Sequence, residues 1–232
     1  AAAASGAKLC SVRRLDLVAG NVVPANAHVV FAPLPVGEPT LQQAMDTVAQ
    51  LKAGDGPRIL FCSDWTARVC NAVGADVKTI TAFYRIYVAC CTALDPEILA
   101  LTQVVWQSTA ILTDPSNYWI SVINAGRHFR LDKVMGPNMK DSDGVGIVIG
   151  RLMRTADVAG LAPATIAFGS SDDATLEAEL ITDFLPAKLP NVTVPTISMV
   201  AAPAVRLQVE RETEALKTPN DEYFLLDDPK VS

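Results

Sequence analysis

The chain has 232 residues, of which half are apolar and only 19% are charged, and its formal net charge is −6. A chain of this length buries a substantial core, and the low charged fraction indicates either a large interior or surfaces that other subunits cover. The excess of acids excludes general electrostatic capture of nucleic acid, although a local basic strip stays open.

The cysteine count and the hydropathy pattern limit the class further. The five cysteines have no zinc-site spacing, and their odd number argues against a disulfide framework, so we expect reduced thiols. The first ten residues lack the apolar region of a signal peptide, and no apolar run reaches the roughly 18 to 20 residues of a membrane span. We therefore expect a soluble protein.

Residues 1–39 are predicted to form an extended N-terminal arm with one or two short strands, because four prolines from position 24 onward interrupt any helix. Helical spacing of apolar residues begins at Thr40, which with Gln43 makes a capping-box pattern. Five helices are predicted in residues 40–126, and they begin near residues 40, 63, 76, 95 and 114. Short loops join them, which is typical of a helical bundle.

Residues 127–232 are predicted to be a mixed second half with an acidic C-terminal tail, continuous with the core. The segments 145–160 and 170–185 read as helices, "PATIAF" reads as a short strand, and "PNVTVPTISMVAAPAV" as extended chain. A last charged helix is expected at "RLQVERETEALK". The fold class predicted from the whole pattern is mainly α, with a helical-bundle core, an extended Pro-rich arm and few short strands.

The sequence lacks the residues that several enzyme classes require. The two histidines, His28 and His128, stand in contexts that favour structural hydrogen bonds over a catalytic base, and there is no G-x-S-x-G elbow. Metal sites lack paired His or Cys ligands, so neither a metal nor a cofactor is expected. The segment "KDSDGVGIVIGRLMRT" carries three glycines behind acidic residues instead of behind a strand, which favours a turn leading into a helix over a nucleotide loop.

A local excess of positive charge is the remaining chemical signal. Between residues 127 and 154 there are six bases and three acids, whereas the rest of the chain has 13 bases and 22 acids. Such a strip could follow an RNA backbone, or its arginines could pair with the surplus carboxylates. The candidate nucleic-acid-binding residues are Arg127, Arg130, Lys133, Arg151 and Arg154.

The stretch "VVWQSTAILTDPSNYW", residues 104–119, resembles the helical core of coat proteins from flexible filamentous plant viruses. That family has a Val-Val-Trp segment followed by Asn and Trp across a Pro-containing loop. Its downstream Phe-Asp motif has no clear match, since "GRHFRLDKV" offers only Phe129 and Asp132. The resemblance implies subunits that stack around RNA.

The leading hypothesis is therefore a structural, self-assembling protein that is not an enzyme, most plausibly a viral coat or nucleocapsid subunit. Its partners would be many copies of itself and RNA, with no membrane and no small-molecule substrate. Its location would be the virion if it is viral, and otherwise the cytoplasm. The alternative is a small-molecule enzyme or binding protein whose site is assembled from scattered residues.

Overall fold

Five short apolar runs form a parallel β-sheet, which is the centre of the structure. The computed structural model describes residues 16–18, 21–140 and 144–203. The strands of this sheet are β3 (His28–Phe31), β4 (Arg58–Cys62), β5 (Thr102–Trp106), β6 (Thr165–Phe168) and β7 (Thr196–Met199), in the order β5-β4-β3-β6-β7. Two further strands, β1 (Asp16–Val18) and β2 (Asn21–Val22), pair with each other in an antiparallel ribbon.

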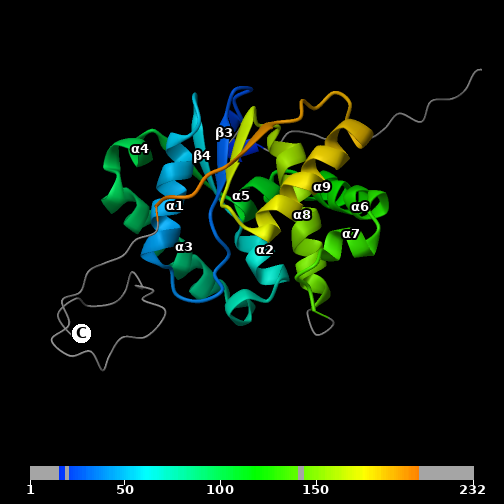
Figure 1. Ribbon diagram of the computed structural model, residues 1–232, viewed down its shortest axis with the longest axis horizontal. Coiled ribbons are helices and arrows are strands. Elements are labelled where there is room, and N and C mark those ends of the chain that lie inside the picture. The colour runs from blue at the N-terminus through cyan, green and yellow to red at the C-terminus, as the bar shows by residue number, and fades with distance from the viewer. Residues whose placement is uncertain (1–15, 19–20, 141–143, 204–232) are drawn as a thin grey trace, which may run out of the picture.

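Helices cover both faces of the sheet, as Figure 1 shows. In the order of the chain they are α1 (Leu41–Lys52), α2 (Asp64–Val69), the 3₁₀ turn η1 (Ala72–Ala75), α3 (Val77–Leu94), α4 (Pro96–Ala100), α5 (Gln107–Leu112), α6 (Pro115–His128), α7 (Leu131–Met135), α8 (Val145–Leu161) and α9 (Asp172–Lys188). The helices α1, α3 and α4 lie on one side of the sheet, and α6, α8 and α9 lie on the other. Parallel strands need such crossover helices, which leave the sheet covered on both faces.

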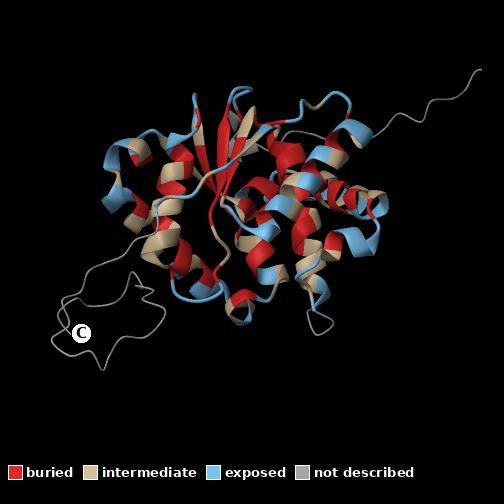
Figure 2. Cartoon of the chain, viewed as in Figure 1, coloured by how far each residue is buried: buried red, intermediate tan, exposed pale blue. Residues whose placement is uncertain are grey.

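Successive side chains of the inner strands point alternately into two hydrophobic clusters, one on each face of the sheet. In β3, Val29 and Phe31 join the cluster shared with α6, α8 and α9, whereas Val30 joins the cluster shared with α1 and α3. The same alternation runs through Ile59 and Leu60 in β4. Figure 2 accordingly shows the inner strands β3, β4 and β6 buried along most of their length, with exposed residues on the outer sides of the helices.

His28 fixes the start of the central strand. Its Nδ1 lies 2.7 Å from the Oγ1 of Thr165 in β6, and its Nε2 lies 2.9 Å from the carbonyl oxygen of Gln50 in α1. Burial lowers the pKa of His28, so the ring is held neutral within these contacts. The structural role predicted for this histidine is confirmed.

The predicted mainly α fold is wrong, because the chain forms an α/β structure around a parallel sheet. Each strand has only four or five residues, and a strand buried on both faces is a continuous apolar run without the period-2 alternation that distinguishes a strand from a helix. The central strand β3 lies within the segment predicted as an arm, and β4 falls between two predicted helices.

Helix starts with a side-chain cap were predicted correctly. Thr40 and Gln43 form the expected capping box at α1, and Asp95 and Asp114 cap α4 and α6 with proline in the first turn. The predicted helix that starts at Asp95 is instead divided into α4, β5 and α5. The charged helix predicted at "RLQVERETEALK" and the acidic tail lie outside the described residues, and the domain boundaries at residues 39 and 126 stay predictions.

Candidate ligand site at the carboxyl ends of the strands

The strand order creates a switch point between β3 and β6, where successive connections leave in opposite directions. In open α/β sheets, ligands bind in the crevice outside the carboxyl ends of the strands at such a point. Here Arg154 of α8 covers this position: its guanidinium carbon lies 3.8 Å from the centroid of the Phe31 ring. Phe31 in turn stacks on Phe168, the last residue of β6, with 6.0 Å between ring centroids.

Arg154 is held there by polar partners from two elements. Its Nε donates to Oε2 of Glu177 at 3.1 Å, and its Nη1 donates to Oγ of Ser63 at 3.2 Å. The arginine is only 7% exposed, so its charge is balanced by Glu177 inside the protein. Arg154 is thus fixed over the end of the central strand by Glu177 and Ser63.

A buried polar network lies one helical turn further along α8. Asp157 accepts hydrogen bonds from Nε2 of Gln107 at 2.9 and 3.1 Å and from the hydroxyl of Tyr118 at 2.9 Å. Gln107 also accepts from the backbone amide of Thr66 through its Oε1, at 2.8 Å. Burial raises the pKa of Asp157 to about 7, against the opposing effects of Arg154 and the two hydrogen-bond donors. This network connects α2, α5, α6 and α8.

The other arginine of α8 has a comparable internal role. Nη1 of Arg151 donates to the carbonyl oxygens of Val134, at 2.8 Å, and of Met135, and Nη2 donates to Asp173 at 2.7 Å. Arg151 therefore ties α7 and the start of α9 to α8. Of the two readings left open for these arginines, pairing with surplus carboxylates describes Arg151 and Arg154.

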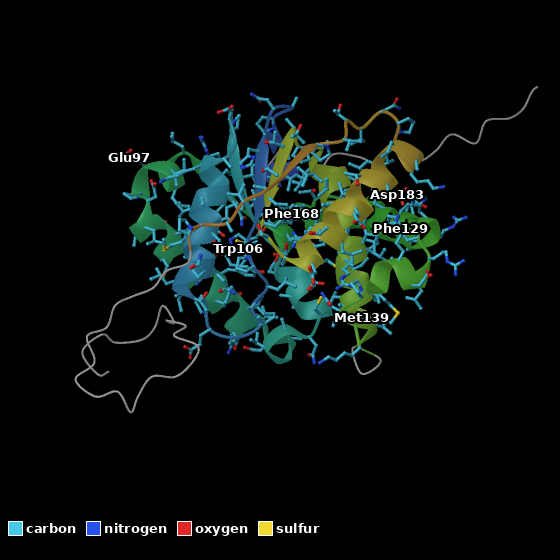
Figure 3. The ribbon with its side chains drawn as sticks, viewed as in Figure 1. Glu97, Trp106, Phe129, Met139, Phe168 and Asp183 are labelled. Carbon is cyan, nitrogen blue, oxygen red and sulfur yellow. The ribbon has the colours of Figure 1, made fainter. Side chains whose placement is uncertain are left out.

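The remaining candidates of the basic strip lie on the outer side of α6 and α7. Arg127 and Arg130 are exposed, Arg130 pairs with Asp132 at 3.2 Å, and Lys133 pairs with Asp183. In Figure 3, Asp183 and Phe129 mark this side of the molecule, away from Trp106 near its middle. The structure thus separates Arg127, Arg130 and Lys133 from the internal Arg151 and Arg154, and nucleic-acid contact stays a prediction.

The glycine segment serves the packing of α8 against α2. A Cβ built on Gly146 would lie 1.9 Å from the carbonyl oxygen of Val69, and one on Gly150 would lie 2.5 Å from Sγ of Cys70. Gly144 is the N-cap residue of α8 and has room for a Cβ. The predicted helix is present as α8, the turn predicted before it falls largely on residues 141–143 outside the described ranges, and the two later glycines permit a close approach of two helices.

A cavity of about 600 Å³ lies on the α3 side of the edge strand β5. The period-2 alternation of the strand turns Val104 and Trp106 toward it, and the helical period of α3 brings Val77, Thr81 and Arg85 to the same side. The start of α2, after β4, and the start of α5, after β5, complete the wall, so the cavity lies at the carboxyl ends of these two strands. Its lining comprises Asp64, Trp65, Arg68, Val77, Ile80, Thr81, Tyr84, Arg85, Val88, Val104, Trp106, Ser108 and Thr109.

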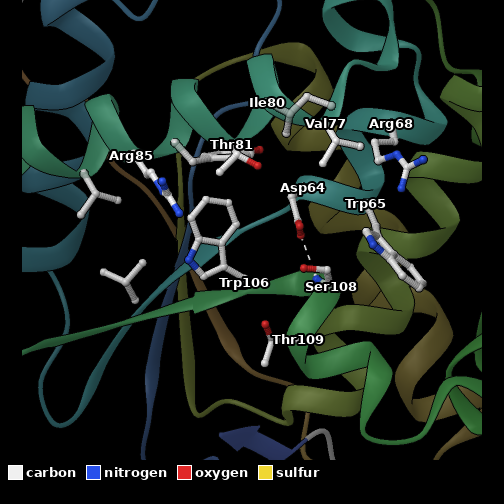
Figure 4. A pocket seen from close by; sticks show the side chains of 13 residues that line it. Asp64, Trp65, Arg68, Val77, Ile80, Thr81, Arg85, Trp106, Ser108 and Thr109 are labelled. Atoms are coloured by element: carbon white, nitrogen blue, oxygen red, sulfur yellow. Dashed lines mark hydrogen bonds between the residues drawn. The ribbon is translucent and has the colours of Figure 1, made fainter.

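The polar groups of this cavity are spread across it, with Asp64, Thr81 and Ser108 near its middle and an arginine on either side, as Figure 4 shows. Oδ1 of Asp64 accepts a hydrogen bond from the backbone amide of Ser108 at 2.8 Å, which fixes the carboxylate at the junction of α2 and α5. In this view Arg85 lies on the Trp106 side of Asp64, and Arg68 lies on the Trp65 side. The cavity therefore combines aromatic surface with groups of both charges.

Tyr84 is the unusual member of the cavity wall. It is fully buried, its ring packs edge-to-face on Trp106 with 5.8 Å between centroids, and its hydroxyl has no hydrogen-bond partner among the described residues. Burial raises the pKa of Tyr84, so the hydroxyl stays protonated. An unpaired buried hydroxyl costs free energy, and in a native protein it calls for a functional explanation.

The described residues offer no metal centre, since no three of their His, Cys, Asp or Glu side chains are grouped to hold an ion. Within the same ranges, no helix has the combination of length and hydropathy that crossing a bilayer requires. The cavity residues themselves were not predicted from the sequence. Tyr84 and Arg85 were in a correctly predicted helix, but its contact with β5 depends on a strand that was read as helix.

The fold is that of known aminoacyl-tRNA synthetases. Tyrosyl-tRNA synthetase from Aeropyrum pernix superposes with a TM-score of 0.66 at 19% identity, over 88% of this chain and 60% of that one. The Leishmania major tyrosyl-tRNA synthetase in complex with tyrosinol superposes with a TM-score of 0.65 at 20% identity, over 82% of this chain and 32% of that one. The Pyrococcus horikoshii tyrosyl-tRNA synthetase complexed with L-tyrosine superposes with a TM-score of 0.64 at 15% identity, over 88% of this chain and 63% of that one.

The chain thus spans less than two thirds of the length of each of these synthetases. No protein-family model matches the sequence, and no curated protein matches it. At these identities the likeness concerns the fold, which is the Rossmann-like α/β arrangement described above.

These findings overturn the coat-protein hypothesis. The stretch 104–119 that carried the resemblance forms β5, α5 and the start of α6 and is not a helical core. The structural neighbours are synthetases and not capsid subunits, so self-assembly around RNA, the virion location, the exclusion of a small-molecule substrate and the exclusion of enzymes are wrong. The alternative of a small-molecule enzyme or binding protein with scattered site residues agrees better with the fold and the cavity.

Proposed function

We propose that this chain binds a small molecule with an aromatic ring, in the cavity between α2, α3 and β5. The observation that carries the proposal is a cavity of about 600 Å³ whose wall combines aromatic rings with groups of both charges. Ligand sites of α/β proteins lie at the carboxyl ends of the strands, and their volumes are typically about 300 to 1,000 Å³. The flanking indoles of Trp65 and Trp106 supply flat apolar surface for a ring.

The structural neighbours support the same ligand class. The Pyrococcus horikoshii and Leishmania major synthetases are described in complex with L-tyrosine and tyrosinol, and both compounds carry a phenol ring. In this chain Arg154 lies over Phe31 at the switch point, and the cavity beside β5 has room for a ring. A reaction on the bound molecule belongs to the same proposal, because Asp64 offers a carboxylate for acid–base work there.

The test measures ligand affinity and the free energy of unfolding in one pair of variants. For Trp106→Leu we expect weaker binding of L-tyrosine and tyrosinol in calorimetric titration, because the cavity loses the indole on which a ring would stack. Tyr87→Phe is the control, since Tyr87 lies outside the cavity lining and its hydroxyl contacts Thr47 and Gln43 of α1 at 2.7 Å. It should lose stability and keep its affinity, and equal affinities of Trp106→Leu and wild type would refute the proposal.

A second proposal concerns nucleic acid. The neighbours are tRNA synthetases by name, and Arg127, Arg130 and Lys133 present positive charge on the outer side of α6 and α7. We expect the triple substitution of these residues by Gln to weaken tRNA binding and to reduce its salt dependence in a filter assay. Salt-independent binding by the wild type would contradict this.

We also propose a cytoplasmic location, since the thiols of Cys62, Cys70, Cys90 and Cys91 are free.

A further inference from the structure

The cavity beside β5 carries a net positive charge, which selects among aromatic ligands. Two arginines line it, Arg68 from α2 and Arg85 from α3, and one carboxylate, that of Asp64. Two positive charges against one negative leave one positive charge in excess. Asp64 is in addition engaged by the backbone amide of Ser108.

The two arginines lack the side-chain partners that several other arginines of the described chain have. Arg130, Arg151 and Arg154 each pair with a carboxylate, and Arg58 donates to two backbone carbonyls. The side chains of Arg68 and Arg85 are exposed and make no ion pair or hydrogen bond with any described residue, although the chain is acidic overall. Guanidinium groups stay charged at all physiological pH values and match planar carboxylates in geometry.

The aromatic part of the wall lies close to this charge. Arg85 and Trp106 occupy the same end of the cavity in Figure 4, and Tyr84 packs edge-to-face on Trp106 from the helix that bears Arg85. A ring that stacks on Trp106 would therefore have a cation near its edge.

We propose that the cavity selects an aromatic carboxylate: the ring lies against Trp106, and the carboxylate pairs with Arg85 or Arg68. This proposal rests on the proposed function, because it specifies the ligand of the same cavity. It adds a prediction about charge. The proposed function requires only an aromatic ring, which a neutral or cationic phenol also has, whereas this proposal requires a carboxylate as well.

The experiment compares three probes that share a phenol ring and differ in charge: 4-hydroxyphenylacetate, L-tyrosine and tyramine. Calorimetric titration of the full chain should give the tightest binding for the acid, weaker binding for the zwitterion and the weakest for the amine. Raising the salt concentration should weaken the binding of the acid most, because exposed charges are screened.

Charge-removing variants assign the effect to the arginines. Arg85→Gln and Arg68→Gln should each weaken the binding of 4-hydroxyphenylacetate by about fivefold, the upper range for one charge contact near water. The affinity for tyramine should be unchanged or higher. Lys78→Gln is the matched control, because Lys78 is an exposed cation on α3 outside the cavity lining. This control should bind all three probes like the wild type.

The outcomes separate the two proposals. Binding of all three probes with equal affinity, or tightest binding of tyramine, would overturn the selection for a carboxylate while leaving an aromatic site. Absence of binding for every probe would overturn the aromatic site itself and this inference with it. An equal loss of affinity in Lys78→Gln and Arg85→Gln would show that the overall charge of the chain, and not the cavity, determines binding.

Discussion

The guanidinium carbon of Arg154 lies 3.8 Å from the ring centroid of Phe31, so a cation from α8 covers the last residue of the central strand. This contact occupies the place where an α/β sheet ordinarily receives its ligand. It is maintained by Glu177, whose carboxylate lies 3.1 Å from Nε of the arginine. The ion pair therefore holds a cation of α8 at the end of the central strand.

Removal of one member of this pair should cost more than removal of both. Arg154→Met leaves the carboxylate of Glu177 in a largely buried position without its cation, and we expect a loss of about 3 to 5 kcal/mol in the free energy of unfolding. The double variant Arg154→Met/Glu177→Gln should recover part of that loss. Urea unfolding of the wild type, both single variants and the double variant gives the coupling energy. Strictly additive losses would contradict an ion pair that contributes to stability.

The stability of the protein should depend on pH through Asp157. Burial raises the pKa of this carboxyl to about 7, above its value in the unfolded chain, so the folded state retains a proton that the unfolded state releases. The stabilising contribution is complete at about pH 4 and below, and it is lost as the pH rises toward about 7. Over this range the loss amounts to about 4 kcal/mol, at ~1.4 kcal/mol for each pH unit.

The variant Asp157→Asn isolates that effect. Its amide keeps one oxygen to accept from Tyr118 or Gln107 and has no proton to lose. Urea unfolding from pH 4 to 7.5 should show the wild type losing stability relative to the variant with rising pH. His28, whose pKa is lowered by burial, contributes with the opposite sign, but it is present in both proteins and cancels from the difference. Parallel pH profiles would show that Asp157 does not titrate in this range.

The sequence predicts the parts of the fold that depend on local chemistry. The capping box of Thr40 and Gln43, and the Asp-Pro starts of α4 and α6, are local patterns and were identified correctly. The strands β4 and β5 were not predicted, because "RILFC" and "TQVVW" are short apolar runs whose β conformation depends on neighbouring strands. The cavity was missed for the same reason, since it exists only where β5 meets α3.

The internal positions of Arg151 and Arg154 show the same limit for the candidate site. Their spacing of three residues places both on one side of α8, as expected, but spacing does not distinguish a solvated side from a buried one. The partners Asp173 and Glu177 lie four residues apart on α9, so a matching pair of carboxylates on a later helix was the available signal. Two acids at this spacing are common, which is why the signal was weak.

The glycines of α8 give a last prediction with a matched control. Gly146→Ala should destabilise the protein by about 1 to 3 kcal/mol, because its Cβ would lie 1.9 Å from the carbonyl oxygen of Val69 and would force α8 away from α2. This loss would occur although alanine is the better helix former by about 1 kcal/mol. Gly144→Ala should be close to neutral, since its φ of −72° suits alanine and the nearest atom found among the described residues is the backbone nitrogen of Gly146, at 4.0 Å. Thermal unfolding of both variants measures the difference, and equal melting temperatures would contradict the close contact between Gly146 and Val69.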